Sequence, residues 1–257
     1  MTLRHIIVPG ADLSAGAQEL PAPAARHVAR VLRMEAGDEL LLLDGRGGRA
    51  KGVIAACSPS AVTLRLEPLP PADGPVTPEL HLIQALPKSG TKLDEIVRRA
   101  TELGATSITP VVTQRSVPRP SKQRAAKRLA RWQRIATEAS RQCRRTHLPQ
   151  VSELMKLDEA LRAAAETATL RIILDLEETT ASLAARLAEG DVNQGVTVAV
   201  GPEGGFDDEE VELATELGFT TASLGPLVLR VETAAIAAVT LSQHYLGGLE
   251  PGAESDE

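Results

Sequence analysis

The sequence predicts an α/β protein in which a small β-rich region is followed by a parallel β-sheet with helices on both faces. Three observations support this fold class. Short strand-like runs fill residues 3–69, strand-like and helical runs alternate between residues 79 and 246, and a proline-rich segment separates the two regions. Repeated strand–helix units form parallel sheets because each connecting helix returns the chain to the same edge of the sheet.

The proline-rich segment PLPPADGPVTP covers residues 68–78, and its five prolines favour a stiff, extended linker. We therefore predict one domain over residues 1–74 and a second over residues 75–248. The remaining residues, 249–257, end in the run GAESDE and are predicted to form a disordered acidic tail.

The first region has the pattern of a small β-barrel. One helix is predicted over residues 21–34, and in it Arg26, Arg30 and Arg33 share one face, which suits a domain that grips a phosphate backbone. The sequence GRGG between the second and third strands indicates a hairpin. The predicted strands are LRHIIV (3–8), ELLLLD (39–44), RAKGVIAAC (49–57) and AVTLRLEPL (61–69).

The second region alternates between the two kinds of element, which is the pattern of a parallel sheet. The predicted strands cover residues 79–86, 106–113, 170–176, 195–200 and 219–224. The predicted helices cover residues 88–104, 121–145, 180–189, 207–217 and 231–246.

Composition argues against several classes of protein. No apolar run approaches the roughly eighteen residues that a membrane span needs, so we expect no membrane segment. Cys57 and Cys143 are the only cysteines and lie far apart, which argues against a disulfide framework and favours a reducing cytoplasm. The five histidines show no metal-ligand spacing, so no metal is expected. Aromatic residues make up only 2% of the chain, which argues against base stacking as its main mode of binding.

Positive charge is concentrated in one segment of an acidic chain. Between Arg115 and Pro149, eleven basic residues against the single acid Glu138 give a local charge of +10. Because the whole chain carries −6, the remainder carries −16. A segregated basic region indicates a polyanionic partner, and nucleic acid is the interpretation we favour over a solvated charged helix.

Three predicted strands of the second region end in unusual sequences: LDLEE (174–178), GPEGG (201–205) and LGPLVLRVETAA (224–235). In open parallel sheets, ligands bind beyond the carboxyl ends of the strands. A single pocket built from these three ends is therefore the simplest interpretation.

The GPEGG sequence is not a P-loop, because it lacks the GK[ST] whose lysine contacts the β- and γ-phosphates. It does not match the GxGxxG fingerprint either. The acids at 207–210 stabilise a helix N-terminus and occupy the place where a phosphate would bind. The ligand is therefore not expected to be held by a phosphate. Gly201, Gly204 and Gly205 allow main-chain groups to approach it closely.

The segment LGPLVLRVETAA is apolar where a loop is normally polar, at Leu224, Leu227, Val228 and Leu229. We expect an apolar loop to be buried, so that its backbone amides must find partners. A nucleoside base fits these requirements, because its edge needs amides and its faces need an apolar slot.

Four stretches together resemble the ribosomal RNA uracil-N3 methyltransferases of the SPOUT superfamily, the RsmE family. These are QALPKSGTKLDEIVRRATELGATSITPVVTQRS, RWQRIATEASRQCRR, VAVGPEGGF and LGPLVLRVETA. The resemblance covers nearly the whole chain, and it implies a PUA-like N-terminal barrel, a SPOUT domain with a C-terminal trefoil knot, and a homodimer. It also implies that the chain uses S-adenosylmethionine to methylate a uridine in 16S ribosomal RNA of the small subunit.

The resemblance assigns a cofactor site to the three strand ends. It implies that the site consists of Leu174, Gly201, Pro202, Glu203, Gly204, Leu224, Gly225, Leu227, Leu229, Thr233 and Ala234. One departure concerns Arg141 and Arg144, which stand where family members commonly carry Glu and Gly in the run Glu-Gln-Cys-Gly-Arg. Two added arginines should strengthen contact with phosphate.

Methylation at uracil N3 requires removal of the N3 proton and in-line positioning of the methyl group. We expect Arg230 and Glu232 to be catalytic, with Arg230 stabilising negative charge on the uracil oxygens. We expect a separate set of basic residues to bind phosphates of the RNA. Such contacts fix the position of the RNA strand but do not read its sequence. This set comprises Arg26, Arg30, Arg33, Arg115, Lys122, Arg144 and Arg145.

Three alternatives remain open from the sequence: a ribose 2′-O-methyltransferase of the same fold, a non-catalytic RNA-binding ribosome assembly factor, and an ATP-binding α/β protein. The missing GK[ST] counts against the third. The intact GPEGG and LGPLVLRVETA segments count against the second.

Overall fold

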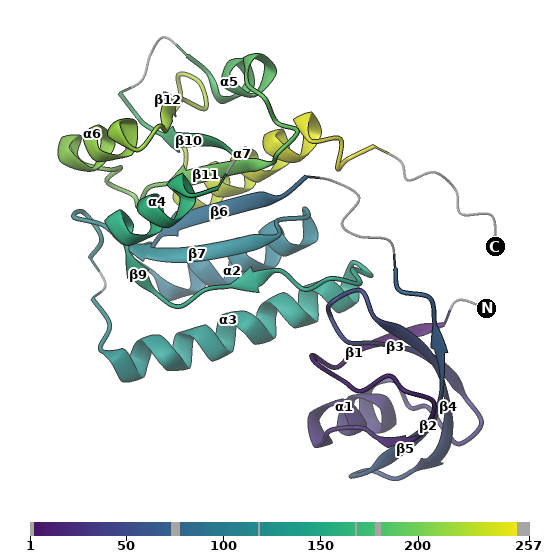
Figure 1. Cartoon of the computed structure of the whole chain (residues 1–257). Coiled ribbons are helices and arrows are strands. Elements are labelled where there is room, and N and C mark those ends of the chain that lie inside the picture. The colour runs from purple at the N-terminus through teal and green to yellow at the C-terminus, as the bar shows by residue number, and fades with distance from the viewer. Residues whose placement is uncertain (1–2, 73–77, 118, 168, 178–180, 251–257) are drawn as a thin grey trace. The chain divides into compact units, whose positions relative to one another are not determined.

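A computed structural model describes residues 3–72, 78–117, 119–167, 169–177 and 181–250 of the chain (Figure 1). The chain divides into two compact units. Unit 1 consists of Met1–Gly74 together with Ser140–Leu148, and unit 2 consists of Pro75–Ala139 together with Pro149–Glu257. The middle of the predicted linker, residues 73–77, and most of the predicted tail, residues 251–257, lie outside the described residues.

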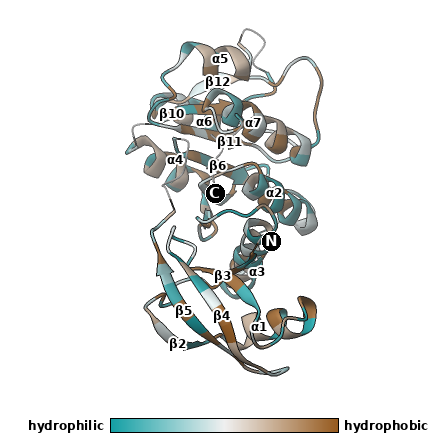
Figure 2. Ribbon diagram, turned by 90° about the vertical axis from the view of Figure 1, so that its right-hand side faces the viewer, coloured by the Kyte–Doolittle hydropathy of each residue, from teal (hydrophilic) through white to brown (hydrophobic). Residues whose placement is uncertain are grey.

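Unit 1 contains a five-stranded sheet in the order β1-β3-β4-β5-β2, in which β1 and β3 are parallel and the other pairs antiparallel. Burial alternates along β4 and β5, so one face covers a core and the other meets solvent (Figure 2). The strands are β1 (Arg4–Ile7), β2 (Gly16–Glu19), β3 (Glu39–Leu43), β4 (Arg49–Cys57) and β5 (Val62–Leu69).

The predicted helix over 21–34 is shorter and irregular. It consists of α1 (Ala22–Arg26) and a π-helical turn, η1 (His27–Val31), and its Ala24, Ala25 and Val28 pack into the core of the sheet. Arg33 lies beyond the helix with φ 53°, so it does not share a helical face with Arg26 and Arg30 as predicted. The wider π turn explains the difference, because its amides bond five residues back, as Leu32 does to His27.

Unit 2 is built on a seven-stranded sheet whose main path is β12-β10-β11-β6-β7-β8, with β9 pairing β7, and whose strand pairs are all parallel. The central strand β11 is buried along its whole length, as expected for a sheet covered on both faces. The strands are β6 (Leu80–Ala85), β7 (Ser107–Val112), β8 (Gln150–Val151), β9 (Met155–Lys156), β10 (Leu170–Leu174), β11 (Val196–Val200) and β12 (Thr220–Ala222).

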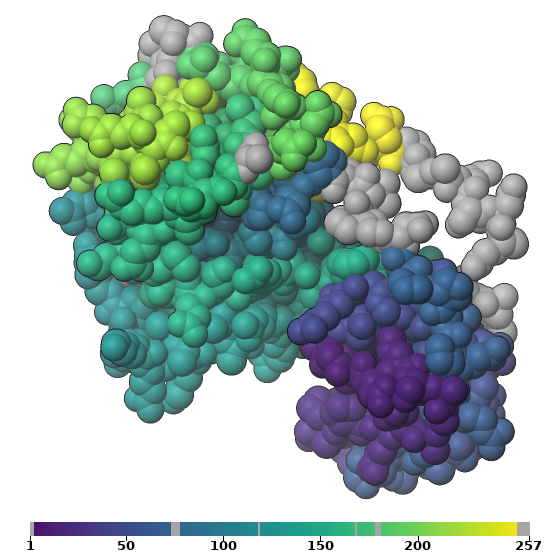
Figure 3. Space-filling view, in the orientation of Figure 1, coloured from purple at the N-terminus to yellow at the C-terminus, as the bar shows by residue number. Residues whose placement is uncertain are grey.

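Helices cover both faces of this sheet, which confirms the predicted parallel α/β architecture. One face packs against α2, α3, α5 and α7, and the other packs against α4 and α6 (Figure 1). In the space-filling view of Figure 3, side chains of α4 and α6 lie at the surface on the side that faces the viewer. The helices are α2 (Gly90–Glu102), α3 (Lys122–Gln142), α4 (Leu157–Ala165), α5 (Leu183–Glu189), α6 (Asp208–Glu216) and α7 (Val231–Tyr245). The last three residues of α3 belong to unit 1.

Four elements are absent from the prediction: β2, β8, β9 and α4. The strands β8 and β9 have two residues each, too few to produce a periodic pattern. The strand β2 has the sequence GAQE, which lacks β-branched residues and is held extended by its pairing with β5. The helix α4 is rich in alanine and buries only Leu157, Ala160 and Leu161.

Candidate functional site

The three unusual strand ends of unit 2 meet in one pocket, as the sequence predicts. Residues from the ends of β10, β11 and β12 and from the start of α7 line it. The pocket is small, with a volume of about 110 Å³. Its lining consists of Leu174, Asp175, Leu176, Val200, Gly201, Pro202, Glu203, Gly205, Ser223, Leu224, Gly225, Pro226, Leu227, Val228, Leu229, Val231 and Ala234.

The apolar segment 224–229 is not buried within the chain, contrary to the expectation from sequence. Leu227 is 75% exposed and Val228 is 83% exposed. Among the described residues, no backbone–backbone hydrogen bond involves an amide or carbonyl of residues 224–229. The segment therefore presents apolar side chains and unpaired backbone groups side by side, and both favour contact with a ligand that is partly apolar and partly polar.

The GPEGG turn is tightly constrained. A side chain at Gly201 would come within 3.2 Å of the backbone of Gly205, and Gly205 itself has φ +70°. Buried Gln84 donates hydrogen bonds to the carbonyls of Ala85 and Val200, the last residue before the turn. After the turn, Asp207 and Glu210 form a capping box at the start of α6. The acids here therefore have the capping role predicted for them.

A cluster of one cation and two carboxylates lies beside this turn. The Lys92 ammonium is 2.9 Å from Glu203 Oε1 and 3.4 Å from Glu232 Oε2. The backbone N–H of Lys88 donates to the other oxygen of Glu203 at 3.0 Å. Lys92 thus connects three elements: α2, the turn after β11 and the first turn of α7.

The hydrogen bond from Lys92 to Glu203 shifts the pKa values of both groups. It is the main cause that raises the pKa of Lys92. Partial burial raises the pKa of Glu203, but hydrogen bonds from the Lys92 side chain and the Lys88 backbone outweigh it and leave that pKa below its ordinary value. Both shifts favour the charged forms, so the ion pair is maintained around neutral pH.

Nine of the eleven residues predicted to bind the cofactor line the pocket, and Gly204 and Thr233 do not. Gly204 is exposed, and its carbonyl accepts a hydrogen bond from Arg115 at 2.9 Å. Thr233 is also exposed and supplies no N-cap, since the N-cap residue of α7 is Arg230.

Arg230 and Glu232, the predicted catalytic residues, have different surroundings. Among the described residues, Arg230 forms no ion pair, and its side chain is exposed beside the pocket-lining Val231. Glu232 faces Lys92, and its side chain is 24% exposed. No ion pair between Arg230 and Glu232 is formed in the described part of the chain.

The predicted RNA contacts fall into both units. In unit 1, Arg26, Arg30, Arg33 and Arg144 are exposed, whereas half-buried Arg145 donates to the carbonyl of His147, and burial lowers its pKa. In unit 2, Lys122 is exposed at the start of α3.

Arg115 supports the GPEGG turn through Gly204, a role that the sequence pattern does not reveal. Arg144, where the resemblance noted from the sequence implies a glycine in the family, has φ 61°.

Sequence reasoning missed Lys92 as a site residue. Lys92 lies in the first turn of α2, which contains no acidic residue, and a cation there opposes the helix dipole. A lysine in this unfavourable position needs acidic partners from elsewhere in the fold. This unfavourable position could have identified Lys92 from the sequence, but it could not have shown which acids the lysine contacts.

Neither a membrane-spanning helix nor a metal-binding cluster is present in the described part of the chain. None of its helices is long and apolar enough to cross a membrane. It also contains no group of three or more His, Cys, Asp or Glu side chains that could hold a metal ion.

Comparisons with known proteins assign the chain to a family. Residues 75–243 match the model of an RNA methyltransferase domain, and residues 20–67 match that of an RNA methyltransferase PUA domain. Ribosomal RNA small subunit methyltransferase E of Synechocystis sp. is 34% identical over 93% of this chain and 76% of its own length. The chain belongs to the ribosomal RNA small subunit methyltransferase E family. The comparisons confirm the predicted family and the prediction that the chain is an RNA methyltransferase.

Other members agree with this assignment. The methyltransferase E of Bacillus subtilis is 29% identical over 86% of this chain and 89% of its own. That of Neisseria gonorrhoeae, solved bound to S-adenosyl methionine, has a TM-score of 0.82 at 30% identity and covers 94% of this chain and 97% of its own. A Legionella pneumophila protein solved with the bound cofactor SAM has a TM-score of 0.85 at 31% identity, over 95% and 98% of the two chains.

We expect Lys92→Met to weaken the binding of S-adenosylmethionine by roughly tenfold, because the GPEGG turn and α7 lose the cation that joins them. Lys92→Arg keeps the charge and should recover most of the affinity. Isothermal calorimetry measures the change. Lys51→Met, which removes an ion pair with Glu39 in unit 1, serves as the control. Unchanged affinity in Lys92→Met would show that the cluster does not organise the pocket.

The ion pair also predicts a dependence of stability on acid. Because the folded-state pKa of Glu203 lies below its ordinary value of 4.5, its contribution is complete above pH 4.5 and is lost as pH falls through the folded pKa. Between about pH 6 and about pH 3, the melting temperature of wild type should therefore fall further than that of Glu203→Gln. Parallel falls in the two proteins would contradict this account.

Proposed function

We propose that this chain transfers a methyl group from S-adenosylmethionine to N3 of a specific uridine in 16S ribosomal RNA of the small subunit. The observation that carries the proposal is the pocket of unit 2. There, a constrained glycine turn and an apolar segment with unpaired backbone groups converge at the carboxyl ends of parallel strands.

The residues of this pocket fit S-adenosylmethionine. Backbone groups of residues 224–229 suit the edge of an adenine, and the side chains of Leu176, Leu227 and Val228 suit its faces. The cofactor, when bound, supplies an electrophilic methyl group on a sulfonium. We assign its binding to Leu174, Gly201, Pro202, Glu203, Gly204, Leu224, Gly225, Leu227, Leu229, Thr233 and Ala234, with Gly204 and Thr233 acting from outside the lining.

The substrate uracil must lose its N3 proton as it attacks, and the charge that develops spreads onto its oxygens. An unpaired, exposed guanidinium beside the pocket suits that charge, so we place Arg230 against the uracil. Glu232 is tied to Lys92, and this favours a positioning role in which it fixes the first turn of α7 beneath Arg230.

The target base must be reachable, so the uridine is unpaired or flipped out of its helix. Phosphates on either side of it are bound by basic residues, which position the strand without reading its sequence. We assign this role to Arg26, Arg30, Arg33, Arg115, Lys122, Arg144 and Arg145.

Several finer features accompany the proposal. We infer that the sheet of unit 1 closes into a PUA-like barrel that forms an RNA-binding domain over residues 1–74, and that residues 75–248 form the SPOUT domain. A C-terminal trefoil knot is supported by the packing of α7 against α2, α5, β6 and β11 after the chain has passed through β12 at the sheet edge. Exposed apolar side chains at the pocket, with Leu227 and Val228 foremost, support a homodimer. The presence of only two cysteines, Cys57 and Cys143, supports a cytoplasmic location.

Calorimetric titration with S-adenosylmethionine should give micromolar-range binding, with ATP as a negative control. Incubation with small-subunit ribosomal RNA should then produce one methylated uridine, located by mass spectrometry of nuclease fragments. A methyl group on the uracil base would support the proposal. A methyl group on the ribose would instead show that the chain is a 2′-O-methyltransferase. RNA binding without cofactor binding, also when RNA is present in the titration, would indicate an assembly factor.

Arg230→Ala should lower kcat by roughly 100-fold, as loss of one donor to a developing oxyanion does, while the Kd for S-adenosylmethionine changes little. Glu232→Gln should also lower turnover more than cofactor affinity. Arg98→Ala, which removes a surface ion pair with Glu95 in α2, is the matched control in unit 2. Turnover near wild type in both test variants would mean that neither residue serves the reaction.

A further inference from the structure

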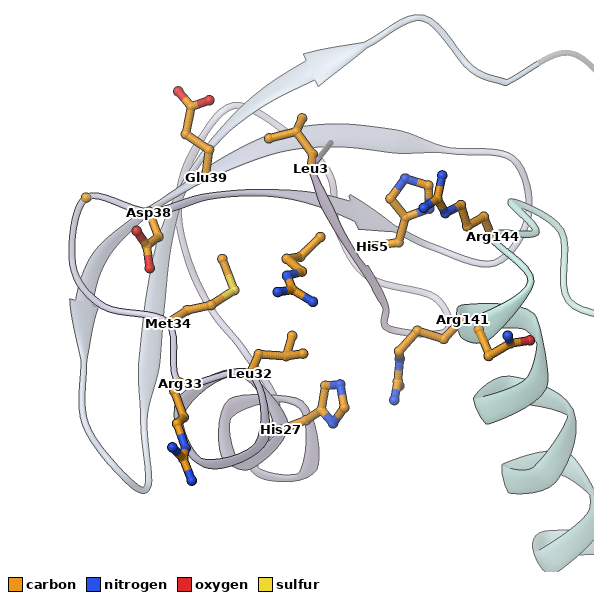
Figure 4. Close-up of a pocket in the computed structure, with 13 residues that line it drawn as sticks. Leu3, His5, His27, Leu32, Arg33, Met34, Asp38, Glu39, Arg141 and Arg144 are labelled. Carbon is orange, nitrogen blue, oxygen red and sulfur yellow. The ribbon is translucent and has the colours of Figure 1, made fainter. Parts of the chain in front are cut away.

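Unit 1 contains a cavity of about 830 Å³ that the cofactor site does not use. It is bordered by the start of β1, the segment after η1, and the end of α3 with the residues that follow it. Its basic lining residues are Arg4, His5, His27, Arg33, Arg141 and Arg144. Figure 4 shows that His5, Arg33 and Arg141 come from three different segments around the same hollow, and that Arg144 follows Arg141 in the third segment. We call this cavity the arginine groove.

The two acids of the groove are already engaged. Asp38 accepts a hydrogen bond from the backbone N–H of Glu35 at 2.8 Å, and Glu39 pairs with Lys51 at 2.8 Å. Among the described residues, no ion pair involves Arg33 or Arg144, and both side chains are exposed. The groove thus keeps an excess of positive charge on a chain whose net charge is −6.

The backbone of two groove arginines is unusual. Arg33 (φ 53°) and Arg144 (φ 61°) are the only residues other than glycine with positive φ in the described part of the chain. Each directly follows the end of a helix, where glycine is preferred because a Cβ is strained in the left-handed region. At the end of α3, the Arg145 N–H bonds to the Ser140 carbonyl, the bond that defines a Schellman cap with Arg144 in the usual glycine position.

A related but wider closure occurs after the π-helical turn η1, where the Met34 N–H bonds to the Val28 carbonyl, six residues back, around Arg33. A residue with a strained backbone, at a position where glycine would be unstrained, indicates a functional role rather than a role in folding. A charged side chain at both of these positions, each bordering the same cavity, is not explained by the stability of either helix end. Burial, followed by the charge of Arg144, lowers the pKa of His5 in the same groove, which agrees with a positive potential there.

We propose that Arg33 and Arg144 each bind one phosphate of the substrate RNA strand in the arginine groove. This inference rests on the proposed function for the identity of the RNA. The planar guanidinium donates two parallel hydrogen bonds to a phosphate, and a cavity of this volume admits the backbone of a short single-stranded segment. The left-handed backbone sets the direction of each side chain, and this is the reason why glycine is absent from both helix ends.

The test replaces each arginine by the residue that its backbone prefers. Arg33→Gly and Arg144→Gly remove a charge and relieve strain together, so the melting temperature of the full chain should stay the same or rise. RNA affinity should nevertheless fall, by about tenfold for the double variant, and the slope of log K against log salt should shrink by ~0.7 per lost phosphate contact. The probe is a fluorescein-labelled fragment of small-subunit ribosomal RNA, measured by anisotropy without cofactor.

Arg65→Gln removes the same charge from the exposed face of β5, outside the groove, and should change affinity less than twofold. Wild-type affinity and slope in the double variant would overturn the inference, as would an equal loss in Arg65→Gln. Failure of the proposed function has a separate readout, because wild type would then bind no S-adenosylmethionine or leave the RNA unmethylated. A wild-type chain that does not bind the RNA fragment would overturn both.

Discussion

The parallel pairing of β6, β11, β10 and β12 is the constraint on which the site of unit 2 depends. The register aligns Ile173 with Ala199 and Leu174 with Ala222, so the strands end together. The three following segments must then leave the sheet at the same edge, although they are separated by more than twenty residues of chain. Because β11 is buried along its whole length and its backbone is paired with β10 and β6, the backbone groups just beyond the strand ends are the first unpaired polar groups available to a ligand.

A second requirement is that these segments hold their shape before any ligand arrives. Glycines allow the tight turn at 201–205 but contribute no side-chain contacts, so the turn is fastened from outside. Lys92 reaches it through Glu203, Arg115 reaches it through the Gly204 carbonyl, and Gln84 holds the Val200 carbonyl from the neighbouring strand. Lys92 also meets Glu232, which ties the start of α7 to the same anchor and links the two cofactor segments through one ammonium group.

Charge is arranged differently around the cavities of the two units. Unit 2 surrounds its pocket with apolar side chains and uses acids to cap α6, which leaves no anion site at that helix and suits a cofactor that is not held by phosphate. Unit 1 instead gathers arginines around a cavity whose acids are engaged elsewhere. The segment 140–148 contributes to this cavity although it follows a long helix of the other sequence region. An acidic protein can thereby present a strongly basic surface to RNA.

The sequence by itself determined the parallel α/β class, the convergence of three strand ends and most of the pocket lining, because these follow from local periodicity and from where parallel strands must end. It did not reveal β2, whose GAQE sequence forms a strand only when β5 is beside it. It also missed the ion pairs of Lys92, since residues 92, 203 and 232 are distant in sequence and no local pattern encodes their meeting. The expectation that the segment 224–229 is buried was wrong. Apolar composition indicates that side chains favour contact with other apolar groups, but it does not show whether those groups belong to the same chain. Only the tertiary structure decided the left-handed arginines, since the φ of a residue after a helix depends on how the chain packs beyond it.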